Sequence, residues 1–440
     1  MNDDIWTRLQ TSRGESPPPL APWRFRFPNT LRTVYQDGKD QRPVFEPALL
    51  HFPNAYRAGD PRFLDERLEF RWLAARRTAL DLVLAAVSGS GYADELVLRG
   101  SVLMSNWYPA TAREPGDLDF VVLCDAWEVS DPRTDAFFDE IARAAERLST
   151  GGSVRIDASG AVSDDIWTYD RVPGRRLMLP WDVEAGDVPG GWVQLDFVFG
   201  ENVHVEPEAA EIALSPGRQG VPLRIASKEL SLAWKLVWLL SDMHPQGKDL
   251  YDAVLLAEDT PLRYSVLRDA VIAADEYLGS RPLTLADLTE LEVEPGWDHF
   301  QREYPSIEGS ADDWEMRLCL ALEPTFTMLD GRPATTYELE ASWINALSSR
   351  IAAMTDDRGD ELQQVLLRAR VPLTAAVVIT RALVGREQMS VADAVRIVLS
   401  TPERADAERG KSDLFRATEI AVHAYEFELR GRRVDGPAPQ

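Results

Sequence analysis

Two short segments constrain the fold of this chain more than any other feature of its sequence. Residues 96–101 read LVLRGS, an apolar run that ends in a Gly-Ser pair, and residues 117–120 read DLDF. Side chains at alternate positions of a strand leave from the same face, so Asp117 and Asp119 converge while the residues between and after them point into a core. The sequence therefore predicts two strands, the second of which carries a pair of carboxylates on one face.

The paired carboxylates predict a site for a divalent cation. Two like charges on one face repel each other, and oxygen ligands with room for phosphate oxygens suit Mg²⁺ or Mn²⁺ better than zinc. A third carboxylate, Asp196, lies in a later apolar run, residues 193–199 (VQLDFVF). If a neighbouring strand brings Asp196 beside Asp117 and Asp119, two cations about 4 Å apart can hold the attacking and leaving oxygens of a displacement at a phosphate.

The Gly-Ser pair has a separate role. Gly100 lets the backbone turn tightly off the strand, and Ser101 opens the next helix, whose free N–H groups favour an anionic phosphate. Arg113 lies four residues before Asp117, where it can reach incoming phosphates if its loop closes over a nucleotide. We predict Gly100, Ser101 and Arg113 as nucleotide-binding residues.

The order of these features resembles the nucleotidyltransferase superfamily: strand, Gly-Ser, helix, strand with Asp-x-Asp, and a later strand with one Asp. Further along, residues 228–235 read KELSLAWK and residues 247–252 read GKDLYD. A lysine in an Ala-x-Lys setting, followed by an Arg/Lys-Asp-Leu-Tyr-Asp helix start, is similar to the AbiEii/AbiGii toxin-type nucleotidyltransferases. The resemblance covers about residues 96–258. One departure is the gap of fifteen residues, 102–116, which is longer than the family pattern usually shows.

The resemblance implies an enzyme that moves a nucleoside monophosphate from an NTP to an acceptor hydroxyl and releases pyrophosphate, with Mg²⁺ or Mn²⁺ as cofactor. It adds Lys235 and Asp252 to the candidate catalytic residues Asp117, Asp119 and Asp196. Lys235 would neutralise charge on the triphosphate, and Asp252 would act in catalysis or orient the lysine. The acceptor is expected to be a tRNA end or a protein hydroxyl. The expected partner is an antitoxin protein, in a type IV toxin–antitoxin or phage-defence system.

The surroundings of Lys235 are informative without the resemblance. Its helix, predicted at residues 228–241, is apolar almost all round, which implies burial. A lysine in such a helix snorkels to the surface, pairs with Asp249 or contacts an anionic ligand. Asp249 and Asp252 lie three residues apart and share a helical face, although capping of the helix start is enough to explain Asp249.

Two other interpretations stay open. An enzyme of the same chemistry that acts on a small molecule, such as an antibiotic hydroxyl, fits the formal net charge of −25 better than an RNA modifier does, because acidic clefts attract cationic compounds. The best candidate for a basic patch is residues 171–176 (RVPGRR), but such loops are usually just solvated. The third interpretation is a catalytically inactive protein that binds only a nucleotide or a partner. The presence of all three acids weighs against it, because a binding module has no need to bury three like charges.

The chain of 440 residues is too long for one ordinary core. We predict a Pro-rich N-terminal arm at 1–60, a nucleotidyltransferase core of α/β (α+β) class with a mixed sheet at 61–205, a helical segment completing the active site at 206–290, and a helical C-terminal domain at 291–440. With no apolar run approaching eighteen residues and no secretion signal at the start, we expect a cytoplasmic protein without a membrane partner. The two cysteines and five histidines suggest no metal or catalytic grouping.

Hydrophobic periodicity locates the remaining elements. Two aromatic residues of the C-terminal half, Trp343 and Tyr425, fit a packed helical core better than an acceptor site. Alternation predicts a strand at 154–157, and helical spacing predicts helices at 61–87, 131–148, 314–322, 337–354, 361–368, 374–383, 391–399 and 414–429.

Overall fold

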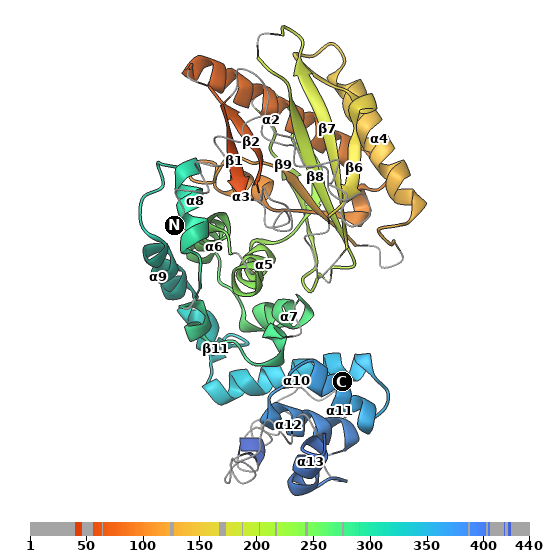
Figure 1. Cartoon of the computed structure of the whole chain (residues 1–440), viewed down its shortest axis with the longest axis vertical. Helices are drawn as coiled ribbons and strands as arrows, with labels where there is room; N and C mark the ends of the chain where they lie inside the picture. The colour runs from red at the N-terminus through yellow and green to blue at the C-terminus, as the bar shows by residue number, and fades with distance from the viewer. Residues whose placement is uncertain are drawn as a thin grey trace, which may run out of the picture. The chain divides into compact units, whose positions relative to one another are not determined.

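The computed structural model describes residues 40–45, 56–63, 65–123, 127–166, 173–186, 188–201, 203–215, 218–242, 245–274, 277–289, 291–385, 388–401, 404, 418 and 421–423. The chain divides into two compact units, Met1–Ser227 and Lys228–Gln440 (Figure 1). The predictions for Tyr425, for most of the last helix and for most of the Pro-rich arm lie outside the described residues, although residues 418 and 421–423 of that helix are described and are helical.

A mixed sheet forms the centre of the first unit. Its strands follow the order β5-β7-β8-β4-β3-β10-β9, and β6 pairs with β7 on the edge that β5 also uses. The pairs β4–β8 and β3–β10 are parallel and the other neighbouring pairs are antiparallel, which confirms the predicted mixed sheet. The elements of this part are β3 (Leu96–Arg99), α3 (Ser101–Trp107), β4 (Leu118–Val122), α4 (Pro132–Ser149), β5 (Val154–Ile156), β6 (Val162–Asp165), β7 (Gly174–Val183), β8 (Gly191–Phe199), β9 (Glu208–Ile212) and β10 (Val221–Ile225), preceded by α2 (Glu66–Ser88).

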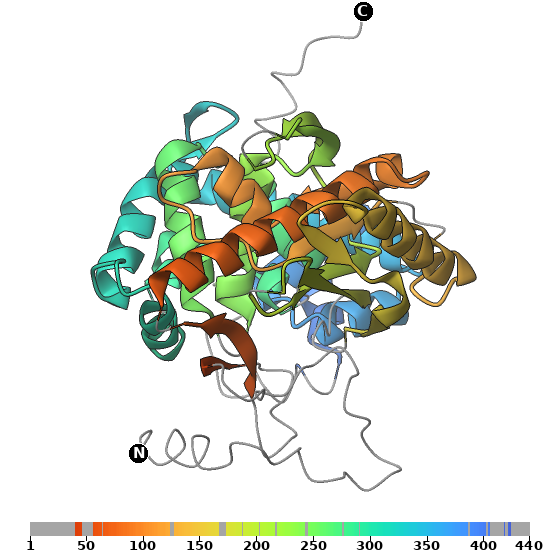
Figure 2. The same ribbon diagram turned by 90° about the horizontal axis from the view of Figure 1, so that it is seen from above.

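Helices α2 and α4 pack against the same face of the sheet (Figure 2). The rings of Phe120 in β4 and Phe197 in β8 stack with centroids 5.3 Å apart, and Phe137 of α4 packs edge-on against Phe197. Strand side chains alternate between faces, so the residues directly before these phenylalanines, Asp119 and Asp196, leave from the opposite face. The aromatic core beneath α4 thus fixes the direction in which both acids point.

The segment before α2 differs from the prediction. The helix predicted at 61–87 begins at Glu66, where the side chain of Asp65 accepts a hydrogen bond from the backbone two residues later. Just before it, β2 (Tyr56–Arg62) pairs antiparallel with β1 (Asp40–Phe45). Part of the predicted irregular arm is therefore a β-hairpin.

The sheet also continues beyond residue 205. Strands β9 and β10 pair antiparallel, and β10 runs parallel to β3, in a stretch where the sequence predicts a helical segment. Their sequences, EAAEI and VPLRI, contain few of the β-branched and aromatic residues that mark strands. Strand β7, ten residues long, begins inside the RVPGRR segment. The sequence Pro173-Gly174 is typical of a turn, but in the structure Gly174 is the first residue of the strand.

The second unit is almost wholly helical, as predicted. Helix α5 has the bounds that the sequence predicts, and the predicted helices from 314 to 399 are present with ends that differ by up to three residues. Trp343 is fully buried and its indole N–H donates to the carbonyl of Gly279 at 2.8 Å, which confirms its core role. The helices are α5 (Lys228–Ser241), α6 (Gly247–Asp259), α7 (Tyr264–Ala274), α8 (Glu294–Glu303), α9 (Ala311–Leu322), α10 (Thr336–Met354), α11 (Asp360–Arg368), α12 (Leu373–Val384) and α13 (Val391–Val398), with a short hairpin of β11 (Met328–Leu329) and β12 (Arg332–Pro333).

Among the helices of the described ranges, none combines the length and apolar composition that crossing a bilayer requires.

Candidate active site

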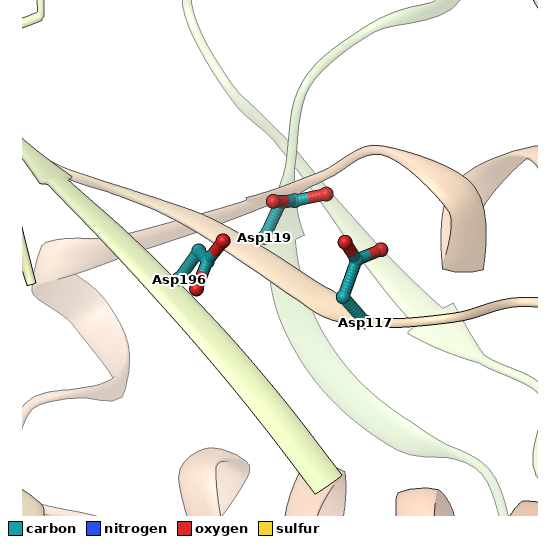
Figure 3. Close-up of side chains that lie close together, drawn as sticks. All are labelled: Asp117, Asp119 and Asp196. Atoms are coloured by element: carbon teal, nitrogen blue, oxygen red, sulfur yellow. The ribbon is translucent and has the colours of Figure 1, made fainter. Parts of the chain in front are cut away.

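Three carboxylates gather where the parallel strands β4 and β8 lie side by side. Asp119 in β4 lies directly opposite Asp196 in β8, and Asp117 precedes β4 by one residue. One oxygen from each carboxylate lies within 4.8 Å of the others, and Figure 3 shows the three groups turned toward one another. Asp196 is buried, while the other two are half-buried and accessible to a ligand. The predicted convergence of these acids is present in the structure.

The Gly-Ser pair supports this group from the adjacent strand. Gly100 follows β3 with φ +81° and ψ −149°, a conformation that favours glycine, and a Cβ there would lie 2.3 Å from Oδ2 of Asp119. The hydroxyl of Ser101 is buried and donates to Oδ1 of Asp117 at 3.2 Å. In the structure both residues therefore fix the positions of the carboxylates. Their contact with phosphates stays a prediction.

Asp196 also forms an ion pair with an arginine of the RVPGRR segment. Arg176 of β7 lies opposite Asp196 and donates from Nε to Oδ1 at 2.7 Å and from Nη2 to Oδ2 at 2.8 Å. Gln194, two residues earlier on β8, donates to Oδ2 of Asp196 at 3.1 Å. Bidentate guanidinium–carboxylate pairs combine charge with a fixed geometry, so this contact holds the third acid in one orientation.

A second arginine flanks the site on its other side. Arg99, the last residue of β3, lies opposite Asp119 in the antiparallel β3–β4 pair. Its guanidinium is buried and binds the carboxylate of Glu201 at 2.5 Å. Across four neighbouring strands one row of residues therefore carries positive, negative, negative and positive charge, in the order Arg176, Asp196, Asp119 and Arg99.

The long loop before β4 is anchored by helix α2. Arg76 is buried and donates to the carbonyl oxygen of Pro115 at 2.6 Å. Arg77 forms an ion pair with Glu114 at the surface. Arg113, predicted to contact phosphates, lies half-buried in this anchored loop. The fifteen-residue gap is thus accommodated by a loop fixed at its C-terminal end, beside the first acid.

Lys235 lies in the second unit and is buried with two acids of α6. Its Nζ is 2.7 Å from Oδ1 of Asp249 and 3.1 Å from Oδ2 of Asp252, and it lies 4.9 Å from the ring centroid of Trp238. Lys235 is 5% exposed and Asp252 is 0% exposed, so the lysine does not snorkel to the surface. Burial raises the pKa of Tyr251, next to Asp252, and the charge of Asp252 raises it further.

Two contributors to these clusters, Arg176 and Arg99, were not predicted from the sequence. Arg176 belongs to the RVPGRR segment, which is typical of a solvated loop, and its contact with Asp196 depends on the pairing of β7 with β8, which this segment does not indicate. Arg99 stands directly before the Gly-Ser pair and so on the predicted strand, where its spacing from Asp119 cannot be read without the register. The pairing of Lys235 with Asp249, one of the alternatives that the sequence leaves open, is present in the structure.

The donor set suits a hard cation. Each of the three convergent residues offers a carboxylate oxygen, and no nitrogen or sulfur ligand belongs to the group. Oxygen ligands of this kind are those that Mg²⁺ and Mn²⁺ prefer, and a position open toward solvent leaves room for phosphate oxygens.

An acidic triad on two parallel strands, next to a Gly-Ser turn, defines the class of nucleotidyltransferases. The family model described as nucleotidyl transferase AbiEii toxin, type IV toxin–antitoxin system, matches residues 82–322, more than half of the chain. The chain belongs to this family and is a nucleotidyltransferase. This agrees with the resemblance found in its sequence.

The chain is similar in structure to MenT4, a nucleotidyltransferase toxin from Mycobacterium tuberculosis H37Rv. The two share 17% sequence identity with a TM-score of 0.40, over 70% of this chain and 99% of the MenT4 chain. No curated protein matches the chain.

Proposed function

We propose that this chain is a metal-dependent nucleotidyltransferase toxin that transfers a nucleoside monophosphate from an NTP to a hydroxyl of a tRNA end or a protein. The convergence of Asp117, Asp119 and Asp196 carries the proposal, together with membership of the AbiEii toxin family. An antitoxin protein is the expected partner. The reaction would take place in the cytoplasm, where NTPs and tRNA are found.

The three acids would hold Mg²⁺ or Mn²⁺. Bound there, the cation would supply positive charge that offsets the repulsion between the acceptor oxygen and the triphosphate. Without it, three carboxylates so close together would repel the substrate as well as one another. Ser101 would keep Asp117 in its binding orientation, and Gly100 would keep the space beside Asp119 open.

The transfer itself is a displacement at the α-phosphorus. The acceptor oxygen forms a bond to this phosphorus, the bond to the oxygen bridging to the β-phosphate breaks, and pyrophosphate leaves. Asp196 would accept the proton of the acceptor hydroxyl. Arg113 would contact the incoming phosphates, and Lys235 would offset the charge that develops on the leaving pyrophosphate. Asp249 and Asp252 would hold Lys235 in place through the contacts already described.

A labelling experiment tests the proposal. The purified protein is incubated with Mg²⁺ or Mn²⁺ and each α-³²P-labelled NTP in turn, with total tRNA or with the protein alone. We expect label on RNA or protein with the wild type, and a rate lower by about 10³-fold with Asp119→Asn, because loss of one of three ligands removes several kcal/mol of transition-state stabilisation. Asp139→Asn is the matched control, since this acid lies exposed on α4. Equal labelling by the two variants would refute the proposed role of the triad.

A second candidate function is the same chemistry on a small cationic acceptor, such as an antibiotic hydroxyl. The net charge of −25 favours it, because a strongly acidic surface attracts cations and repels RNA. Metal-dependent NTP binding in calorimetry without label on RNA or protein would favour this acceptor class. If no NTP binding appeared either, a binding-only protein would be the better explanation.

A further inference from the structure

The ion pair between Arg176 and Asp196 stands in an unusual place for a cation site. Asp196 is buried, its side chain is 5% exposed, and Arg176 is 14% exposed, so water screens the pair weakly. The guanidinium donates to both oxygens of the carboxylate that is expected to bind a cation. A positive side chain thus already occupies the surroundings of the third acid.

We propose that Arg176 opposes cation binding at Asp196, so that one cation binds through Asp117 and Asp119 alone and the cation shared with Asp196 binds only together with the triphosphate. The proposal rests on the metal-dependent transfer proposed above and adds the order in which the site is filled.

The charges of the site support this order. The three carboxylates and the guanidinium of Arg176 sum to minus two, and Asp164, which lies in register with Arg176 on β6, brings the sum to minus three. Arg99 adds nothing to this sum because Glu201 neutralises it. One divalent cation offsets most of this charge, and a second would leave an excess of one positive charge in a weakly screened place, which is unfavourable. The triphosphate supplies the negative charge that the second cation needs.

Arg176 weakens cation binding at Asp196 whether its side chain stays in place or moves away. A carboxylate oxygen has a second lone pair, so a cation can bind Asp196 beside Arg176, but two positive charges then lie on one group and repel each other. If Arg176 instead turns away, its ion pair with the buried carboxylate is lost. Asp164, which lies opposite Arg176 on β6, would then offer the nearest acid in register. In both cases a cation binds at Asp196 more weakly than it would if the three carboxylates were present without Arg176.

Direct measurement of Mn²⁺ binding tests the proposal without using activity. Free Mn²⁺ is followed by electron paramagnetic resonance at pH 8, in the absence of nucleotide, for the wild type, Arg176→Gln and Arg175→Gln. Arg175 is the matched control because it is the neighbouring arginine of β7, leaves from the other face and pairs with Asp135 and Asp165. We expect the weaker Mn²⁺ site to tighten by about tenfold or more in Arg176→Gln, since groups in direct contact couple by amounts of this size, and to stay unchanged in Arg175→Gln.

Equal Mn²⁺ affinities in Arg176→Gln and the wild type would overturn the proposal. If Arg176→Gln does not fold, as judged by circular dichroism, the number of Mn²⁺ ions that the wild type binds tests the proposal instead. One bound Mn²⁺ without nucleotide and two with a non-hydrolysable NTP analogue would support the proposal, and two without nucleotide would contradict it. A different result would show that the three acids do not form a metal site at all: Asp119→Asn would then bind Mn²⁺ with the affinity of the wild type.

Discussion

Gly100 leaves no room for a side chain beside Asp119. The backbone of Gly100 has φ +81°, and the carboxylate of Asp119 fills the volume in which any other residue would place its Cβ. Two constraints therefore act on one position: a conformation that costs L-residues about 1 kcal/mol or more, and a steric limit set by a proposed metal ligand. The sequence predicted the tight turn, but the contact with Asp119 follows only from the antiparallel pairing of β3 and β4.

Comparison of Gly100→Ala with a second glycine variant should separate the steric effect on Asp119 from the cost of the backbone conformation. Gly100→Ala is expected to lower the transfer rate by about 10²-fold or more, because the methyl group displaces the carboxylate of Asp119 from its position. Gly151→Ala is the control, since Gly151 has a similar φ of +75° but nothing within 4 Å of an added Cβ. Initial rates and thermal unfolding should show a small stability loss and normal activity for the control. Equal activity of the two variants would mean that the site tolerates the displaced acid.

Residue order along the chain was enough to predict the acids, because strand periodicity fixes the face on which Asp117 and Asp119 leave. It was not enough for Arg176, whose contact with Asp196 depends on which strand neighbours β8. That neighbour is β7, a strand opened by a Pro-Gly sequence that locally favours a turn. Pairing with β8 over eight residues overrides this local preference, and such pairing is not visible in the segment itself.

At the scale of elements, helix α2 connects the core to the entrance of the site. Its inner face packs on the sheet, and Arg76 and Arg77 on α2 hold the loop that leads to Asp117. The contacts differ in strength. Arg76 is buried and donates a hydrogen bond to the carbonyl oxygen of Pro115. The ion pair of Arg77 with Glu114 is exposed and contributes little to stability.

Loss of the buried anchor should therefore matter more than loss of the exposed one. Arg76→Leu leaves the Pro115 carbonyl without this donor, and we expect a transfer rate lower by about tenfold, since misplaced catalytic groups slow a reaction strongly. Arg77→Leu should change the rate by less than about twofold. Steady-state kinetics with varied NTP would check this, with circular dichroism to confirm folding. A larger effect of Arg77→Leu would show that the surface ion pair, and not the buried contact, orders the loop.

Helices were predicted better than strands for a physical reason. Helical spacing is contained within one segment, so α5 and α10 could be read with bounds correct to about one residue. Strands β9 and β10 gain their stability from pairing with each other and with β3, and their short, weakly apolar sequences do not indicate this. The sheet therefore extends to Ile225, beyond residue 205, at which the predicted core ends.

At the scale of the whole molecule, the chain consists of two compact units that meet in sequence between Ser227 and Lys228. Each unit has an apolar core of its own, with fully buried aromatic residues such as Phe120 and Phe197 in the first and Trp297 and Trp343 in the second. The proposed site residues are divided between them. The carboxylate triad belongs entirely to the first unit, and Lys235 with its two acids belongs entirely to the second.

This division predicts which functions are separable. A fragment of residues 40–227 is expected to unfold cooperatively and to bind Mn²⁺ as the intact chain does in the absence of nucleotide, because every carboxylate of the triad and its partners Ser101 and Arg176 are present. It should not transfer label from an NTP, because Lys235 is missing. The full-length Lys235→Met variant is the matched comparison and should match the fragment in both properties. Thermal unfolding, Mn²⁺ titration and the labelling assay measure the three outcomes. Transfer by the fragment would remove Lys235 from the proposed mechanism, whereas loss of Mn²⁺ binding in a folded fragment would show that the triad alone does not make the cation site.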